Sequence, residues 1–342
     1  IALGHCNTSS GYASVAFGQS NRSTNCQTTV AGGNCNCATG ELSFVGGGNG
    51  VCATACLAAA VGGGNNRASG ARSFLGGGSA NTASGYISVV VGGDTNIAND
   101  RYGVVGGGST NTASNTYATV SGGLSNTASA SRSTIGGGQG NVASGNCSTV
   151  GGGLSNTSSG CFTTVGGGYG NIACNSGYGT IGGGYFNCVG FVAFVGGGDG
   201  NKALGCYSAI AGGYLNSALG NCSFIGGGGG VGCGNAASGA HSVIGGGQGN
   251  IVSARDSFIG GGDRNRACGC GLHVIGGGFN NTASGNYYSS VLSGESSVAS
   301  GRNSVIAGGL SNTASANYSF VGGGQSNTAS GACSFVGGGF GN

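Results

Sequence analysis

Apolar and small polar residues along this chain follow a pattern that repeats about every fifteen residues. In each repeat one aliphatic residue precedes a run of glycines, and that residue serves as the register mark. Most successive marks are 15 residues apart, and the longest interval, 19 residues, separates Ile225 from Ile244. The marks are Val15, Val30, Val45, Val61, Leu75, Val90, Val105, Val120, Ile135, Val150, Val165, Ile181, Val195, Ile210, Ile225, Ile244, Ile259, Ile275, Val291, Ile306, Val321 and Val336. Such a period indicates a repeat architecture in which each repeat forms one turn.

Each repeat follows the consensus S-F/T/V-V-G-G-G-x-x-N-T-A-S-G-x-x, whose positions we number 1 to 15. Positions 1 to 5 carry β-branched or aromatic residues beside small ones, which predicts a short strand, for example over 133–137. The Asn-Thr-Ala-Ser run predicts a second short strand, for example over 81–84. Glycines between the strands provide the corners. One such turn is too small to bury a core, but turns stacked about 4.8 Å apart pair their backbones along the stack.

The expected fold is therefore an all-β parallel β-solenoid, or β-roll, of about 22 turns with two short strands in each. We expect one continuous repeat domain over residues 1–342, with an extra loop near 226–240 where GGGGGVGCGN lengthens a turn. A helical alternative is excluded, because glycine inside a helix costs about 1 kcal/mol per residue.

Two positions of the repeat are expected to face the interior. Position 3 is the aliphatic mark, and position 11, an alanine in many turns, is expected to face it from the opposite strand, as at Ala83, Ala98, Ala113, Ala128 and Ala143. The core prediction names Val105, Val120, Ile135, Val150, Val165, Ile181, Val195, Val321 and Val336.

Position 9 is asparagine in nearly every turn. Stacked amides can donate to one another and satisfy the carbonyl groups of the corners, so we expect a structural ladder. A row of amides that binds a ligand is the alternative. The expected ladder comprises Asn81, Asn96, Asn111, Asn126, Asn141, Asn156, Asn171, Asn201, Asn216, Asn312 and Asn327.

Position 13 is usually glycine, and we expect a left-handed corner there because Gly, Asn and Asp tolerate a positive φ. The glycines are Gly85, Gly145, Gly160, Gly205, Gly220, Gly285, Gly301 and Gly331. Asp100, Asn115 and Asn175 replace glycine in other turns, whereas Ala130, Ala254 and Ala316 depart from the rule.

Position 2 is expected to point outward, because neighbouring residues of a strand face opposite sides. It carries an apolar row that is too extensive to leave in water, so we expect identical chains to associate side by side along it. The alternative is a flattened roll in which positions 2 and 3 are both partly internal. The expected inter-chain stripe comprises Phe44, Phe74, Phe194, Phe224, Phe258, Phe320 and Phe335.

Composition removes several protein classes. The chain has 342 residues, 86 of them Gly, with no Pro, and 5% are charged. Collagen would need Gly at every third position and much Pro, and a disordered linker would lack regularly placed Val, Ile and Thr.

The net charge of +3 and the absence of a basic run with interleaved aromatics argue against a nucleic-acid partner. No apolar segment is long enough for membrane insertion, and the first residues do not resemble a signal peptide. Because the chain contains no Met, we expect a piece of a longer protein.

Strings such as SVIGGGQGNIVSA, STIGGGQGNVASGNCSTV and TASGNYY resemble the head repeats of trimeric autotransporter adhesins, and are similar to repeats of phage and large-virus fibre proteins. The similarity covers residues 12–342. It implies a left-handed parallel β-roll and three rolls packed around an axis. The chain departs from the family pattern in three ways: a period nearer fifteen than fourteen, a Gly-Gly-Gly segment in place of Ala-Ile-Gly, and many cysteines.

The 16 cysteines include one pair at equivalent positions of adjacent turns. Cys37 and Cys52 both occupy position 10, about 4.8 Å apart in a stack, which makes them a candidate disulfide. Two other pairs, Cys147 with Cys161 and Cys206 with Cys222, are offset by one position and so face opposite sides. A bridged pair would indicate an oxidising, extracellular setting; free buried thiols that act as small apolar residues are the alternative.

Residues for catalysis or metal binding are sparse. His5, His241 and His273 lie many turns apart, so we expect no catalytic triad or acid–base dyad. The Cys-x-Cys spacings do not match zinc sites, and no Gly-x-Gly-x-x-Gly opens a helix. We expect no enzyme, no cofactor and no metal.

These observations favour a non-enzymatic structural fibre or adhesin segment, extracellular and on a cell or virion surface, that forms a homotrimer and contacts an unidentified surface receptor. An ice-binding solenoid is one alternative, because positions 10 and 12 give rows such as Thr82/Ser84 and Thr112/Ser114, although Ile97 interrupts them. A filament that polymerises end to end is another, because solenoid ends expose unpaired strand edges.

Overall fold

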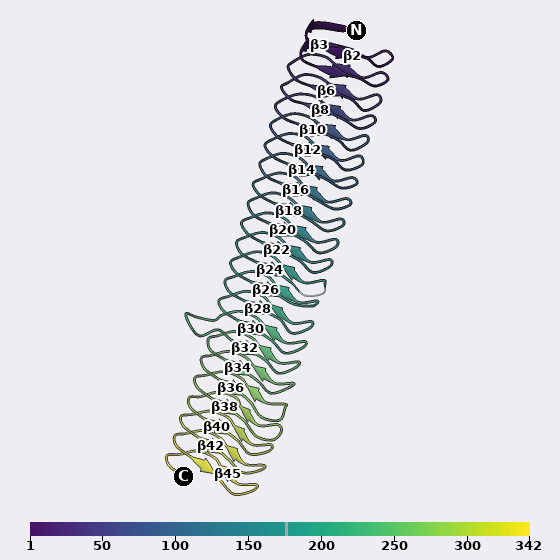
Figure 1. The fold of residues 1–342 in the computed structure, drawn as a ribbon. Coiled ribbons are helices and arrows are strands. Elements are labelled where there is room, and N and C mark those ends of the chain that lie inside the picture. The colour runs from purple at the N-terminus through teal and green to yellow at the C-terminus, as the bar shows by residue number, and fades with distance from the viewer. Residues whose placement is uncertain (175–176) are drawn as a thin grey trace. The chain divides into compact units, whose positions relative to one another are not determined.

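The computed structural model describes residues 1–174 and 177–342, and these residues form strands, bridges and turns but no helix. They fall into two compact units, Ile1–Gly170 and Asn171–Asn342. Each unit is a stack of similar turns, in which successive strands of one row lie side by side (Figure 1). The single continuous domain stays a prediction, and Asn175 lies outside the described residues.

Each turn contributes one strand to each of two rows, and nearly every strand is two residues long. In the first unit, the row that carries positions 2 and 3 comprises β1 (Ala2–His5), β3 (Val15–Gln19), β5 (Thr29–Val30), β7 (Phe44–Val45), β9 (Ala59–Ala60), β11 (Phe74–Leu75), β13 (Val89–Val90), β15 (Val104–Val105), β17 (Thr119–Val120), β19 (Thr134–Ile135), β21 (Thr149–Val150) and β23 (Thr164–Val165). The row that carries positions 10 and 11 comprises β2 (Thr8–Ser9), β4 (Arg22–Ser23), β6 (Cys37–Ala38), β8 (Cys52–Ala53), β10 (Arg67–Ala68), β12 (Thr82–Ala83), β14 (Ile97–Ala98), β16 (Thr112–Ala113), β18 (Thr127–Ala128), β20 (Val142–Ala143) and β22 (Thr157–Ser158).

The second unit repeats this arrangement. Its row with positions 2 and 3 comprises β25 (Thr180–Ile181), β27 (Phe194–Val195), β29 (Ala209–Ile210), β31 (Phe224–Ile225), β33 (Val243–Ile244), β35 (Phe258–Ile259), β37 (Val274–Ile275), β39 (Ser290–Val291), β41 (Val305–Ile306), β43 (Phe320–Val321) and β45 (Phe335–Val336). Its row with positions 10 and 11 comprises β24 (Ile172–Ala173), β26 (Cys188–Val189), β28 (Lys202–Ala203), β30 (Ser217–Ala218), β32 (Ala236–Ala237), β34 (Ile251–Val252), β36 (Arg266–Ala267), β38 (Thr282–Ala283), β40 (Val298–Ala299), β42 (Thr313–Ala314) and β44 (Thr328–Ala329).

Strands of one row pair in parallel and in register, so equivalent residues of successive turns are direct neighbours. Val105 pairs with Val120, and Ala113 with Ala128. The predicted parallel β-solenoid with two short strands per turn is confirmed. A third line of contact was not expected: position 7 forms single-residue parallel bridges, such as the one between Asp94 and Ser109.

The side chains at positions 3 and 11 form the core of each unit, as expected. Val105, Ile135 and Ala113 have no solvent-exposed surface, and of the named core residues only Val336, in the last strand, is partly buried. Two register marks are wrong by one residue. Ala16 and Ala60 are buried at position 3, whereas Val15 is half-buried and Val61 is 46% exposed. The mark is defined as the aliphatic residue that precedes the glycine run, but inward orientation is set by strand register.

The left-handed corner expected at position 13 is wrong. Gly85 and the other glycines named for this position do not have positive φ, whereas Gly269, in a lengthened corner, does (104°); positive φ recurs instead at positions 6, 8 and 15, as at Gly78 (87°), Ala80 (54°) and Ile87 (54°). Position 13 favours glycine for steric reasons, because a Cβ at Gly85 would meet the carbonyl oxygen of Asp100 in the next turn. The non-glycine residues at positions 8 and 15 are held by backbone bonds to the preceding turn, such as Ala80 N–H to the Gly64 carbonyl (2.8 Å).

The extra loop lies where the long interval predicts it. It leaves the stack after β31 and returns at Asn235, and its Val231 side chain is 90% exposed. Figure 1 shows this loop projecting near β30. The neighbouring turns are undisturbed, because Asn235 still donates to Gly227 and Gly247 at 3.0 and 2.9 Å.

Candidate functional site

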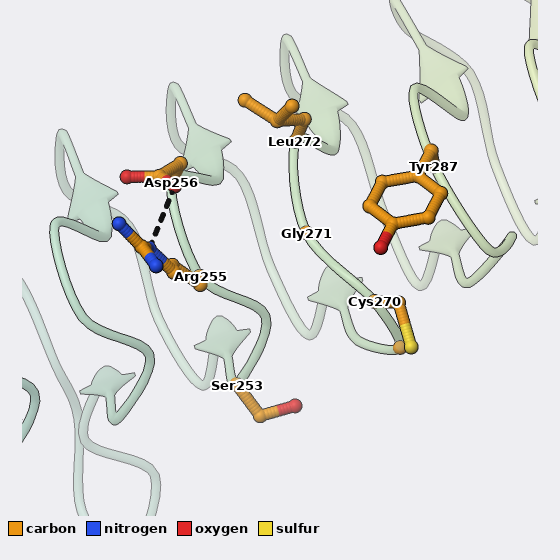
Figure 2. Close-up of a pocket in the computed structure, with 8 residues that line it drawn as sticks. Ser253, Arg255, Asp256, Cys270, Gly271, Leu272 and Tyr287 are labelled. Atoms are coloured by element: carbon orange, nitrogen blue, oxygen red, sulfur yellow. Dashed lines mark ion pairs between the residues drawn. The ribbon is translucent and has the colours of Figure 1, made fainter.

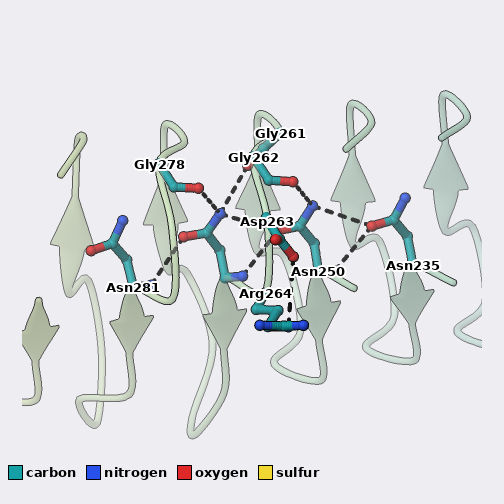
Figure 3. A network of polar contacts seen from close by, with 9 residues as sticks. Asn235, Asn250, Gly261, Gly262, Asp263, Arg264, Gly278 and Asn281 are labelled. Carbon is teal, nitrogen blue, oxygen red and sulfur yellow. Dashed lines mark hydrogen bonds and ion pairs between the residues drawn. The ribbon is translucent and has the colours of Figure 1, made fainter. Parts of the chain in front are cut away.

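The asparagines at position 9 are buried and bonded to both neighbouring turns. Figure 3 shows the arrangement around Asn250: its Nδ2 donates to the Gly262 carbonyl of the next turn at 2.9 Å, and its backbone N–H donates to Oδ1 of Asn235 at 3.0 Å. Nδ2 also donates to the Gly246 carbonyl of its own turn at 3.0 Å. Each amide therefore bonds mainly to backbone groups, and direct bonds between amides, such as Asn126 to Asn111 (3.2 Å), occur only in some turns. All eleven residues of the expected ladder are buried.

Glycine at position 6 makes room for these amides. A Cβ at Gly78 would meet Nδ2 of Asn81 at 2.8 Å and the Gly93 carbonyl, and the positive φ of Gly78 disfavours other residues. The amide nitrogen and the glycine carbonyls of adjacent turns thus close each corner. Because every hydrogen-bonding atom of such an amide is engaged with the fold, these asparagines are placed as structural groups.

The position 2 side chains point away from the core in both units. In the first unit Phe44 is 41% exposed, and in the second Phe194 is 45% exposed. Phe74, Phe224 and Phe258 are similarly exposed, Phe320 is half-buried and Phe335 is the most exposed. Phe320 and Phe335 stack on each other with ring centroids 5.1 Å apart. The seven phenylalanines therefore lie on outward rows, with Val, Thr, Ala or Ser between them.

Glycines at positions 4 and 5 differ in what surrounds them. At position 4 a Cβ would collide with a backbone carbonyl of the next turn, as at Gly76, where it would meet the Val91 carbonyl oxygen, with Cε1 of Phe74 3.6 Å away. At position 5 the space is open, and a Cβ at Gly77 or Gly183 would meet no atom within 4 Å. In such turns the fold gives no steric reason for glycine, whereas in others, such as that of Gly227 (φ 146°), the positive φ favours it.

The polar rows at positions 10 and 12 are in register but discontinuous. Thr112 pairs with Thr127, but Ile97 precedes this pair and Val142 follows it. In the second unit Ile251 is 40% exposed in the same row. The rows expected for ice binding thus contain apolar interruptions, and ice binding stays an untested prediction.

The structure brings two pairs of cysteines together on the outer face of the position 10 strands. Cys37 and Cys52 are register partners in β6 and β8, both half-buried and unbridged. Cys174 and Cys188 were missed by sequence reasoning, yet their sulfur atoms are 3.9 Å apart. They occupy positions 12 and 10, which face the same side of a strand, so the two-residue alternation could have revealed them.

Basic and aromatic side chains gather at positions 14 and 15 in the first unit. Arg72 donates to the Tyr86 hydroxyl at 3.0 Å, and Arg101 lies over the Tyr86 ring, 5.3 Å from its centroid. Tyr102 and Tyr117 stack with centroids 4.7 Å apart. The sequence contains no basic–aromatic run, but a period of fifteen stacks residues that are far apart in the chain. The reasoning that excluded a basic cluster is therefore wrong, while the absence of a nucleic-acid partner stays a prediction.

A surface hollow of about 470 Å³ lies in the second unit beside a lengthened corner. Figure 2 shows Arg255 and Asp256 at one end of it and Cys270 and Tyr287 at the other. The Asp256 carboxylate accepts from Nε of Arg255 at 2.9 Å and contacts Nδ1 of His241 in the preceding turn at 2.8 Å. The spacing of the histidines alone did not reveal this contact between a histidine and a carboxylate on adjacent turns. Both side chains are exposed to solvent, and the absence of a catalytic dyad stays a prediction.

His273 occupies position 1, where most turns have serine, and it is fully buried. Its Nδ1 contacts the Ser289 hydroxyl at 2.8 Å, whereas Nε2 has no hydrogen-bond partner. Burial away from water lowers the pKa of the His273 imidazole below its ordinary value. The side chain is therefore held neutral inside the stack.

Within residues 1–174 and 177–342, no three His, Cys, Asp or Glu side chains are grouped closely enough to hold a metal ion. The same residues include no helix with the length and apolar character of a membrane span.

No protein-family model and no curated protein matches the chain. The likeness to adhesin head repeats, and the handedness it implies, thus stay predictions.

Proposed function

We propose that this chain is a non-enzymatic structural segment of an extracellular fibre or adhesin, in which identical chains associate side by side, as a trimer. The observation that carries the proposal is the outward row at position 2. Its apolar side chains recur on in-register strands of both units, and five of its phenylalanines are 40% to 45% exposed. An apolar surface repeated along a whole protein is costly to leave in water.

The repeat itself favours a second copy of this chain as the partner. A surface whose features recur once per turn, about 4.8 Å apart, is matched along its length by a surface with the same spacing. The open glycines at position 5 support the same interpretation, because a neighbouring backbone can approach closely where no side chain intervenes. With few charges on the chain, apolar packing is expected to dominate the contact.

The low charge, the uniform register and the hydrogen-bonded corners favour a stiff segment that resists proteolysis. We therefore propose a cell or virion surface as the location. An unidentified surface receptor would contact the outer corners, which vary most between turns, while the strand rows keep the chains together.

The test is the oligomeric state in solution, measured by sedimentation equilibrium. We expect a trimer for the natural chain and a shift to monomer when Phe194, Phe224 and Phe258 are all changed to Thr. Threonine occupies the same position in other turns, such as Thr180, so the fold is expected to remain.

The matched control changes Ile172 and Ile251, on the other strand row, to Thr. These side chains are as exposed as the phenylalanines, at 42% and 40%, so we expect the control to keep the association of the natural chain. A natural chain that sediments as a monomer would contradict the proposal, and so would a triple Phe variant that associates unchanged.

A further inference from the structure

The position 10 row of the first unit places two thiols between two guanidinium groups. Arg22 pairs with Cys37, Cys37 with Cys52, and Cys52 with Arg67, each in register on successive parallel strands. The residues that follow them in their strands, Ser23, Ala38, Ala53 and Ala68, are buried, so these four side chains share the outer face. Both arginines are exposed, and both cysteines are half-buried.

We propose that Cys37 and Cys52 form a redox-active dithiol that reacts with anionic low-molecular-weight disulfides. Cys52 is the attacking thiolate and Cys37 the thiol that resolves the mixed disulfide. The arginines on either side favour the thiolate and attract the carboxylates of the incoming disulfide. This inference is independent of the proposed association of chains.

The two sulfur atoms are electrostatically unequal. A hydrogen bond from the Cys37 thiol, together with the Arg67 guanidinium, lowers the pKa of Cys52 to about 6, while the same hydrogen bond raises the pKa of Cys37. A hollow of about 330 Å³ opens directly beside Cys52 and Arg67, so a small disulfide can reach the sulfur. Cys52 is therefore the sulfur that lies beside both the hollow and the Arg67 guanidinium, where a small anionic disulfide arrives.

The reaction balances as a two-electron exchange. The Cys52 thiolate attacks one sulfur of the small disulfide, its S–S bond breaks, and one small thiolate leaves and takes a proton from water. Cys37 then loses its proton to solvent, and its sulfur attacks the Cys52 sulfur, which releases the second small thiolate. The protein gains one disulfide, and the small disulfide is reduced to two thiols. Directly paired parallel strands lie about 4.8 Å apart, within the Cα separation that a disulfide spans.

The second unit provides an internal comparison. Cys174 and Cys188 are also close, with sulfur atoms 3.9 Å apart, and Cys188 pairs with Lys202. Here burial raises the pKa of Cys188 to about 11, so its thiol stays protonated near neutral pH. Proximity alone would make both pairs react alike, whereas the proposal requires the first pair to react faster.

The experiment treats the fully reduced chain with glutathione disulfide at pH 7 and follows the products by mass spectrometry after digestion at Arg and Glu. Cleavage at Arg22, Glu41 and Arg67 separates the two cysteines into peptides 23–41 and 42–67, and fragmentation identifies the linked residues. We expect a Cys37–Cys52 link that forms at least about tenfold faster than a Cys174–Cys188 link.

Variants separate the roles of the two thiols. Cys37→Ser is expected to stop with one glutathione retained on Cys52, and Cys52→Ser to remove the fast reaction. Arg67→Thr, a residue found at this position in other turns, is expected to slow the reaction about threefold to tenfold with glutathione disulfide. It should have less effect with the neutral hydroxyethyl disulfide. Circular dichroism checks that each variant retains its strands. Equal rates for the two pairs, or a fast reaction in Cys52→Ser, would overturn the proposal.

Discussion

Asparagine at position 9 is the residue that joins one turn to the next. Its side chain accepts from the backbone of the following asparagine and donates to glycine carbonyls on both sides, as Asn81 does with Gly77 (3.0 Å) and Gly93 (2.8 Å). A buried carbonyl or N–H that loses its partner costs about 1–3 kcal/mol. The side-chain amide therefore contributes more to the stability of the fold than its location in a corner suggests.

We expect Asn126→Ala to lower the free energy of unfolding of the first unit by about 2–4 kcal/mol, because it leaves the Gly122 carbonyl and the Asn141 backbone N–H without partners and removes one of the two hydrogen bonds to the Gly138 carbonyl. The matched control is Asn126→Ser. Serine occupies this position naturally at Ser297, where its hydroxyl accepts from the backbone of Asn312 at 3.3 Å. We expect the serine variant to lose clearly less stability in urea unfolding. Equal losses in the two variants would show that the amide contacts are not the cause.

His273 makes the stability of the second unit depend on pH. Its folded-state pKa lies below its unfolded value of about 6.5, so the unfolded chain binds the proton more readily. The free energy of unfolding is therefore not reduced by this histidine above about pH 6.5. It decreases as the pH falls below that value, because the unfolded chain then takes up the proton.

We expect the natural chain to lose more thermal stability between pH 7.5 and pH 5 than His273→Ser, which restores the usual residue of position 1. Differential scanning calorimetry at both pH values measures the difference, and exposed His241 changed to Ser serves as a control. Parallel pH profiles for the natural chain and His273→Ser would contradict the assignment.

At the scale of the turn, the three consecutive glycines have three different environments. Position 4 lies against a backbone carbonyl of the next turn, position 5 faces open space in turns such as that of Gly77, and position 6 has positive φ against the asparagine amide. Sequence alone presents them as one motif. The same substitution, glycine to alanine, is therefore expected to change the stability of the fold differently at neighbouring positions.

We expect Gly78→Ala to destabilise the first unit by about 2 kcal/mol or more, because position 6 combines positive φ with a blocked Cβ. Gly77→Ala, one residue earlier, should leave the unfolding midpoint unchanged or raise it slightly, because alanine restricts the unfolded chain. Thermal unfolding compares the two directly. A large loss in Gly77→Ala under monomeric conditions would contradict the open environment of position 5.

Sequence periodicity was sufficient for the elements and most of the core, because in-register stacking makes each position keep one environment along a unit. The prediction was wrong at positions where the residue type alone does not tell which side chain faces the core or why a glycine is present. Ala16 and Ala60 fill core positions beside larger valines, and Gly85 is selected by a neighbouring carbonyl instead of by φ. Positive φ at positions 8 and 15 was missed because many residue types occupy them, including Tyr102 and Arg132.

At the scale of the whole molecule, the period also determines which distant residues become neighbours. Sequence reasoning found Cys37 with Cys52 because they share a position, but it missed Cys174 with Cys188 and the Arg–Tyr cluster around Tyr86. These groups combine adjacent or alternate positions of successive turns, and the side on which such positions meet depends on strand register and corner geometry. The spacing of residues along the sequence does not contain that information.

The loop that leaves the stack after β31 has a practical consequence. The turn that contains Val231 is four residues longer than most, because its register marks lie 19 residues apart, and it still closes through Asn235 onto its neighbours. A corner with this tolerance is a natural place to graft a foreign peptide, such as an epitope or an affinity tag. Side-by-side assembly of many such chains would then display the graft at regular intervals, turning a repetitive scaffold into a multivalent array.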